Sequence, residues 1–116
     1  MRDPEHSSDR AKARQQVGEA QSLAALADLR EEIDGLDRSL LDLLVRRADL
    51  ARDISRIKRA LHRPVQDPER ERAAFEERRA WAVELGLDPD FVERIFAEIL
   101  VWSRGVQERE QEEGPR

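Results

Sequence analysis

Apolar residues recur at alternating intervals of three and four between residues 26 and 61, which is the heptad pattern of a helix with one apolar stripe. Ten of the eleven seam positions hold Leu or Ile, and the eleventh holds Arg47. The pattern predicts one long helix over about residues 23–61. The two edges of the seam are Leu26, Ile33, Leu40, Arg47, Ile54 and Leu61, and Leu29, Leu36, Leu43, Leu50 and Ile57.

Turn and capping residues predict two further helices. Pro64 disfavours helix at the preceding residue and therefore closes the first helix. Asp67-Pro68 supplies an N-cap acid and a proline at the first helical position, and Gly86 suits the C-terminal cap of the helix that follows. Asp88-Pro89 repeats the start signal for a third helix. The apolar stripe of that helix is Val92, Ile95, Phe96, Ile99, Leu100 and Val106.

The composition favours an all-α fold. Charged residues make up 41% of the chain and aromatic residues 4%, whereas strands are enriched in aromatic and β-branched residues. Cysteine is absent, which removes disulfides and thiolate nucleophiles. We expect three helices per protomer in a domain over residues 23–107. A disordered N-terminal tail (1–22) and a frayed C-terminal tail (108–116) would flank this domain.

Charge and hydropathy exclude several classes of protein. The net charge of −5 argues against a nucleic-acid partner, because sequence-independent binders need a basic face. No stretch approaches the roughly 20 apolar residues of a membrane span, and the first residues lack the apolar core of a signal peptide. We therefore expect a cytoplasmic protein without membrane partners. His6 lies in a polar tail and His62 in a loop, so neither a metal site nor a cofactor is expected.

The length of the first helix predicts self-association. A helix of about 38 residues would measure roughly 57 Å. A compact domain of this size has a diameter near 35 Å, estimated from a radius of gyration of about 13 Å. A second copy would cover the overhanging seam, which predicts an intertwined helical homodimer. The alternative is a helix that breaks midway, although no Pro or Gly lies between residues 36 and 61 to break it.

Arg47 is the most informative polar residue, because a guanidinium in an apolar seam stays charged and needs an anion. Lys58 follows eleven positions later on nearly the same face, about 16 Å along the axis, which suits opposite sides of a small ligand. Arg30 points about 100° away and could reach the other subunit of an antiparallel dimer. The alternative is that a carboxylate of the protein itself pairs with Arg47.

Further polar residues interrupt the apolar faces of the two shorter helices. Ser103 and Gln107 extend the stripe of the third helix, and Arg70 and Glu71 lie just after the cap of the second helix. Each could have a purely structural role, such as support of the helix dipole. Together they predict a pocket without His, Cys or Tyr. Such a pocket fits a small dianion whose reaction needs orientation and electrostatic stabilisation.

A set of residues in a fixed order and spacing runs through the predicted domain. It consists of Leu29-Arg30-Glu31-Glu32-Ile33-Asp34, Leu36-Asp37, Arg47, Lys58, the run from His62 to Glu71, Ser103 and Gln107. With these residues the chain from about Leu26 to Gln107 resembles the all-helical type II chorismate mutases. The resemblance implies an intertwined homodimer with two shared sites and no cofactor. It also implies a [3,3] rearrangement of chorismate to prephenate, on the route to phenylalanine and tyrosine.

The same resemblance implies roles for the pocket residues. Arg47 and Arg30 of the partner subunit would bind the two carboxylates of chorismate. Lys58 and Gln107 would donate hydrogen bonds to the ether oxygen that gains negative charge as its C–O bond breaks.

Four other residues would complete the site by resemblance. Glu71 and the backbone near Asp67 would hold the ring hydroxyl. Arg70 would assist on the hydroxyl side, and Ser103 would assist at a carboxylate.

Three alternatives remain open. The runs 81–91 and 99–102 are similar to isochorismate-pyruvate lyases of the same fold, and amino-chorismate mutases share that fold as well. Glu71 favours the chorismate mutase, because those relatives tend to carry an apolar residue at this position. The third alternative is a non-catalytic helical dimerisation module, in which the polar seam residues set the helix register.

Overall fold

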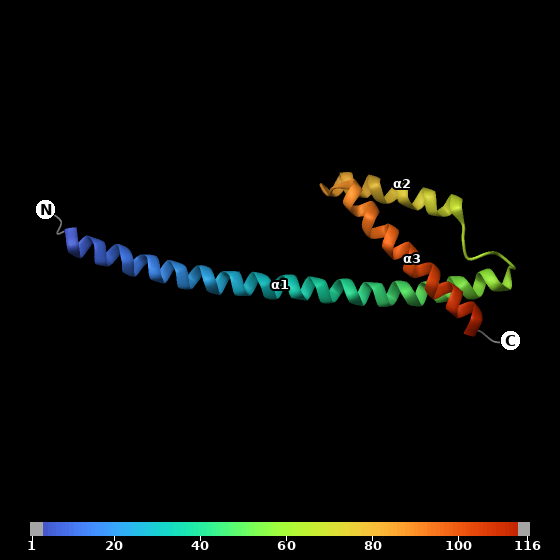
Figure 1. The fold of residues 1–116 in the computed structure, drawn as a ribbon, viewed down its shortest axis with the longest axis horizontal. Helices are drawn as coiled ribbons and strands as arrows, with labels where there is room; N and C mark the ends of the chain where they lie inside the picture. Colours follow the sequence, from blue (N-terminus) through green and yellow to red (C-terminus); the bar gives the residue numbers. More distant parts are fainter. Residues whose placement is uncertain (1–3, 114–116) are drawn as a thin grey trace. The chain divides into compact units, whose positions relative to one another are not determined.

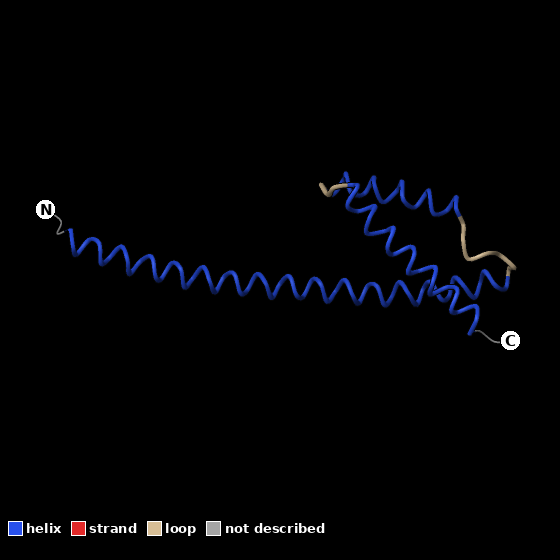
Figure 2. The backbone as a smooth tube through the Cα atoms, viewed as in Figure 1, coloured by secondary structure: helices blue, strands red, loops and turns tan. Residues whose placement is uncertain are grey.

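The computed structural model describes residues 4–113, with side chains from residue 10 onward. Three helices make up this range: α1 (Pro4–Ala60), α2 (Pro68–Leu85) and α3 (Pro89–Glu113), with no strand among the described residues (Figures 1 and 2). The predicted all-α protomer with a very long first helix is confirmed. None of the described helices carries an apolar stretch that could cross a membrane.

The N-terminal end of α1 differs from the prediction. The helix begins at Pro4 rather than near residue 23, so residues 4–22, expected to be disordered, are helical. Residues 10–22 show no apolar period, but most of them are Ala, Arg, Lys, Gln or Glu, which have high intrinsic helix propensity. Propensity therefore continues the helix without a buried face. Residues 1–3 of the expected tail lie outside the described residues.

The chain divides into two compact units, one ending at Leu43 and the other beginning at Leu44, and α1 contributes to both. The part of α1 before residue 44 exposes the apolar seam. Leu29 is 56% exposed and Leu36 is 65% exposed. The seam therefore forms a continuous helix face, as predicted, but no described side chain of the same unit covers it.

The second unit has its core where α1 crosses α3 (Figure 1). Ala48, Ala51 and Val106 form a buried cluster, and the small alanines allow the two helices to approach closely. Ser55 is fully buried in the same interface, and its Oγ donates a 2.7 Å hydrogen bond to the backbone carbonyl of Gln107. This bond fixes the position of α3 along its axis relative to the last turns of α1.

The C-terminal end of α3 also differs from the prediction. The helix continues to Glu113 instead of fraying from residue 108, because α1 holds its last turns. Arg56 Nε lies 2.8 Å from Glu110 Oε1, and Arg59 donates to the carbonyls of Glu110 and Gln111. The periodicity of apolar residues does not report such polar contacts, so it could not predict this end of the helix. Residues 114–116 of the expected tail lie outside the described residues.

The predicted caps of the shorter helices are confirmed. Asp67 accepts a 3.1 Å hydrogen bond from the backbone N–H of Arg70, and Pro68 occupies the first turn of α2. Gly86 ends α2 in the left-handed conformation with φ 73°, which a residue without a Cβ adopts at little cost. Asp88 accepts from the backbone N–H of Asp90 at the start of α3.

His62 ends α1 in a conformation that is unfavourable for its type. Its φ is 54°, and its N–H donates to the carbonyl of Arg59 at 3.1 Å. A residue with a Cβ costs about 1–2 kcal/mol in the left-handed region. Glycine avoids this cost but loses about 0.5–1 kcal/mol more backbone entropy on folding. We predict that His62→Gly raises the free energy of unfolding by about 0.5–1 kcal/mol, measured by urea denaturation at fixed protein concentration.

His62→Ala is the matched control, because it removes the imidazole and keeps the Cβ. It should give no gain in stability. Equal stability of the glycine variant and the wild type would contradict the proposed backbone strain.

Candidate active site

The unit beginning at Leu44 contains a pocket of about 370 Å³. All three helices and the loop before α2 contribute to it, with apolar walls that include Ile54, Phe75, Phe96 and Leu100. Seven of the eight predicted site residues line this pocket, and Arg30 does not. The polar and charged residues around it are Arg47, Lys58, Asp67, Arg70, Glu71, Arg78, Ser103, Arg104 and Gln107.

Lys58 and Gln107, two of the predicted site residues, meet inside the pocket. The Nζ of Lys58 donates to the carbonyl of Val65 at 2.7 Å and to the Oε1 of Gln107 at 3.2 Å. An ammonium group has three donors, so one remains for a ligand. The oxygen of Gln107 accepts from Lys58, which leaves its NH₂ group as a second donor. The pair can therefore present two N–H groups to one ligand oxygen.

Ser55 supports this pair, although no pattern in the sequence predicts that role. Its hydroxyl holds the backbone of Gln107 from the opposite side of the helix crossing. The available signal was the spacing of Ala48, Ala51 and Ser55, three small residues on one face of α1. Such spacing is typical of a close helix contact and not of a ligand site.

Arg47 is a half-buried cation with an open counter-ion position. Among the described residues no Asp or Glu forms an ion pair with it, and Arg78 lies close enough to act on its charge. Burial, and secondly the neighbouring Arg78 guanidinium, lower the pKa of Arg47 from its usual value. Arginine nevertheless remains protonated near neutral pH. The alternative of a protein carboxylate paired with Arg47 therefore finds no support in residues 10–113.

Glu71 is held by Arg104, a residue that no pattern in the sequence marks as part of a site. Arg104 Nε lies 3.1 Å from Glu71 Oε1, and its Nη2 contacts Oε2. The hydrogen bond to Glu71 is the main reason why the pKa of Arg104 is raised. A carboxylate has about four acceptor positions, so Glu71 can still accept a hydrogen bond from a ligand hydroxyl.

The remaining predicted residues line the pocket in different states of burial. Ser103 is buried, with 6% of its surface exposed. Asp67 and Arg70 are exposed, and Asp67 is engaged as the cap of α2. These two residues therefore lie at the solvent side of the pocket.

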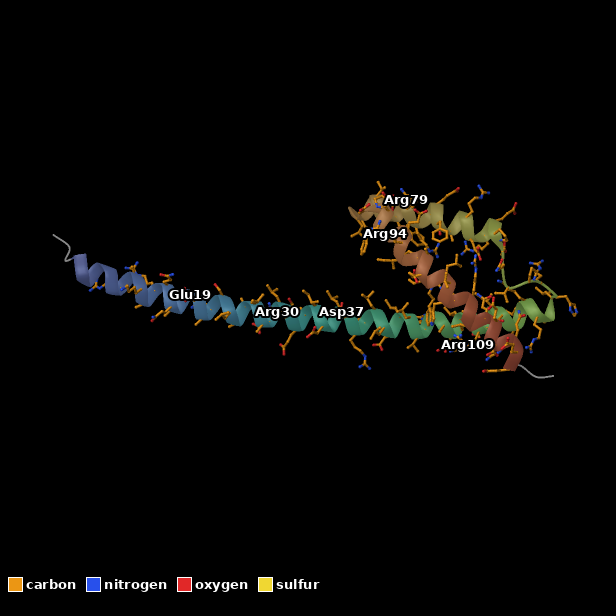
Figure 3. All side chains as sticks on the ribbon, viewed as in Figure 1. Glu19, Arg30, Asp37, Arg79, Arg94 and Arg109 are labelled. Carbon is orange, nitrogen blue, oxygen red and sulfur yellow. The ribbon has the colours of Figure 1, made fainter. Side chains whose placement is uncertain are left out.

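Arg30 lies apart from the pocket residues in the chain. It is an exposed residue of α1 in the unit that ends at Leu43, and Figure 3 shows its side chain on the surface of the helix. The pocket includes no residue before Arg47. A role for Arg30 in the site of another subunit remains a prediction.

The chemistry available in the pocket is electrostatic. Its side chains offer guanidinium, ammonium, amide, hydroxyl and carboxylate groups, and among the described residues no three His, Cys, Asp or Glu side chains are grouped to hold a metal. No imidazole lines the pocket. The arrangement suits binding and orientation of an anion, with donors directed at an oxygen that develops negative charge.

The fold and this donor set coincide with a known enzyme family. The sequence profile of chorismate mutase type II matches residues 29–108, and the chain belongs to that family. The matched range contains every predicted site residue and both of the additional pocket arginines, Arg78 and Arg104.

Individual relatives within the family carry different names. The chain is 46% identical over 77 residues to the isochorismate pyruvate lyase of Pseudomonas aeruginosa, covering 66% of this chain and 75% of that protein. It is 33% identical over 88 residues to the chorismate mutase of Methanocaldococcus jannaschii, covering 76% of this chain and 89% of that protein. It is 36% identical over 78 residues to the T-protein of Enterobacter agglomerans, of which it spans only 21%.

Proposed function

We propose that this protein is a chorismate mutase that rearranges chorismate to prephenate. The observation that carries the proposal is the convergence of Lys58 and Gln107 in a pocket that also contains Arg47, which forms an ion pair with no Asp or Glu among the described residues. A pericyclic rearrangement needs no nucleophile and no general base. It needs the substrate in a compact conformation and donors at the oxygen of the breaking C–O bond.

The cations supply the orientation in this proposal. Arg47 binds one carboxylate of chorismate, and Arg30 of the partner subunit binds the other. Holding both ends brings the enolpyruvyl group over the ring, where the new C–C bond forms. Such positioning replaces a search through unproductive conformers with one reactive geometry.

Lys58 and Gln107 supply the electrostatic stabilisation. As the C–O bond breaks, the ether oxygen gains negative charge and becomes a better acceptor for both donors. Charge-assisted hydrogen bonds contribute roughly 1.5–3 kcal/mol each, and enzymes lower barriers by at least about 8 kcal/mol. Several such bonds that strengthen in the transition state reach that order without a covalent intermediate.

Glu71 and its neighbours orient the ring. In the proposal Glu71 accepts a hydrogen bond from the ring hydroxyl while Arg104 holds the carboxylate in place. The backbone near Asp67 and the side chain of Arg70 assist at the hydroxyl, and Ser103 assists at a carboxylate.

The uncovered apolar seam of α1 supports a homodimer. Exposed Leu and Ile side chains at heptad positions are stabilised when a second helix covers them. An intertwined arrangement would also bring Arg30 of one chain to the pocket of the other. The proposed active unit is therefore two chains with two shared sites.

The second candidate is an isochorismate-pyruvate lyase, which the 46% identity to the Pseudomonas aeruginosa protein favours. Chorismate and isochorismate are both dianions and differ in the positions of the ring hydroxyl and of the ring double bonds, so the pocket cations suit either. The residue placed to distinguish them is Glu71, an acceptor for a hydroxyl in the pocket.

Product identification distinguishes the two candidates. Purified protein is incubated separately with chorismate and with isochorismate, and the products are identified by liquid chromatography and NMR. We expect prephenate from chorismate. Release of pyruvate from isochorismate, without formation of prephenate from chorismate, would refute the proposed mutase activity and support the lyase activity.

A further inference from the structure

Arg78 lies in the pocket and has no part in the function proposed so far. It lies on α2, seven residues after Glu71, and its side chain is 18% exposed. A cation that is so little exposed to solvent, in a pocket large enough for a small ligand, either binds an anion or has a purely structural role.

Two aromatic rings fix the position of this guanidinium. The Cζ of Arg78 lies 5.1 Å from the centre of the Trp81 ring and 5.2 Å from that of Phe96. Its Nη1 donates to the carbonyl of Ala74 at 3.1 Å. Aromatic faces attract a cation and leave its N–H groups available in the guanidinium plane. The guanidinium is therefore preorganised, and its donors are not used up.

The acid nearest to Arg78 neutralises it only weakly. Glu77 is the ion-pair partner found in the described chain, at 3.8 Å, and its side chain is 54% exposed. Exposed ion pairs at such distances add little to stability. A guanidinium has five N–H donors, so the contacts to Ala74 and Glu77 leave several of them open.

Arg78 and Arg47 act on each other as like charges beside the same cavity. Burial and the charge of Arg78 both lower the pKa of Arg47, so the proximity of the two guanidiniums has an electrostatic cost. An anion between them would remove that cost. The chain has a net charge of −5, and yet this part of the pocket concentrates positive charge.

We propose that Arg78 is a substrate-binding residue that, together with Arg47, binds one carboxylate of the dianionic substrate. This inference rests on the proposed function and adds a residue to it. One carboxylate then meets two guanidiniums of the same chain, from α1 and α2, and the other meets Arg30 of the partner subunit. A substrate with only one carboxylate cannot use both positions, so Arg78 contributes to selectivity for dianions.

The test compares Arg78→Met with Arg72→Met, using whichever of chorismate and isochorismate the wild type consumes. Methionine keeps an apolar side chain against Trp81 and Phe96 and removes the charge. Arg72 lies on the same helix outside the pocket, and its side chain is 72% exposed. We expect KM to rise about 10–100-fold for Arg78→Met, with a smaller change in kcat, and to stay within about twofold for Arg72→Met.

Two further variants separate binding from folding. Arg78→Lys keeps the charge without the planar fork and should recover part of the lost affinity, whereas Arg78→Gln should not. Circular dichroism and light scattering check that each variant is folded and assembled. An Arg78→Met protein that is folded and has wild-type KM overturns the proposal, and so does rescue by glutamine equal to that by lysine.

A double-mutant cycle with Arg47→Met tests whether the two residues share one carboxylate. If the two residues bind the same carboxylate, the second substitution should raise KM by a clearly smaller factor than the first. Fully additive effects on KM would contradict this arrangement. The outcome for the proposed function is separate. A wild type that neither converts nor binds either substrate ends the proposed function and this inference with it. Turnover by the wild type with an unaffected Arg78→Met ends the inference alone.

Discussion

Replacing Lys58 with Met is expected to reduce kcat by about 10²–10³-fold, the usual cost of removing one donor to a developing oxyanion. Lys58 is the charged member of the donor pair, and it lines the pocket beside Gln107 with one N–H donor left for a ligand. The loss should appear mainly in kcat, because the ether oxygen attracts the donor most strongly in the transition state. The decrease in chorismate measures the rate, with prephenate identified as product.

Two controls accompany this variant. Arg52→Met changes a cation of α1 that is 43% exposed, pairs with Asp49 and lies outside the pocket, so turnover should be unchanged. Gln107→Leu removes the neighbouring donor without disturbing the bond from Lys58 to Val65, and it should also lower kcat. Wild-type turnover in both Lys58→Met and Gln107→Leu would refute the site assignment. Altered assembly without loss of turnover would support the non-catalytic dimerisation module.

Mixing two inactive variants is expected to restore activity if the sites are shared between subunits. Arg30→Met and Arg47→Met should each lose most of their turnover as pure proteins. In a mixed dimer one site lacks both arginines, and the other site retains both. Random exchange makes half of the dimers mixed, so roughly a quarter of wild-type activity should return, the proportion that twofold symmetry dictates.

The experiment needs subunit exchange, achieved by mixing the unfolded variants and refolding them together, and the activity is compared with that of each variant refolded alone. Arg46→Met is the matched control, because Arg46 is the exposed neighbour of Arg47 and should keep full activity. Mixtures no more active than the separate variants would refute a shared site. Full activity of Arg30→Met alone would remove Arg30 from the site.

The sequence predicts the helices wherever apolar period or capping chemistry carries the signal. The seam from Leu26 to Leu61 and the caps at Asp67, Gly86 and Asp88 are local patterns, and the structure confirms them. The predicted positions of the two outer helix ends are wrong, because neither apolar period nor capping determines these ends. Intrinsic propensity extends α1 to Pro4. An ion pair from Arg56 and hydrogen bonds from Arg59 hold the last turns of α3 as far as Glu113.

Most of the site could be predicted because polar residues on apolar stripes are conspicuous. Lys58, Ser103 and Gln107 stand out against their neighbours in the sequence, and all three line the pocket. Arg78 and Arg104 did not stand out, since arginines are frequent in this chain and a charged residue on a helix is usually solvated. Their position in the pocket follows from the packing of α2 against α3, which no local pattern encodes.

The bond from Lys58 to the carbonyl of Val65 ties the connection between the first two helices to the ammonium group that is proposed to stabilise the transition state. The same ammonium that would face the substrate also anchors the segment on which α2 begins. Lengthening or shortening residues 61–67 would therefore move the ammonium itself. In the proposed mechanism, the length of that short connection is tied to turnover.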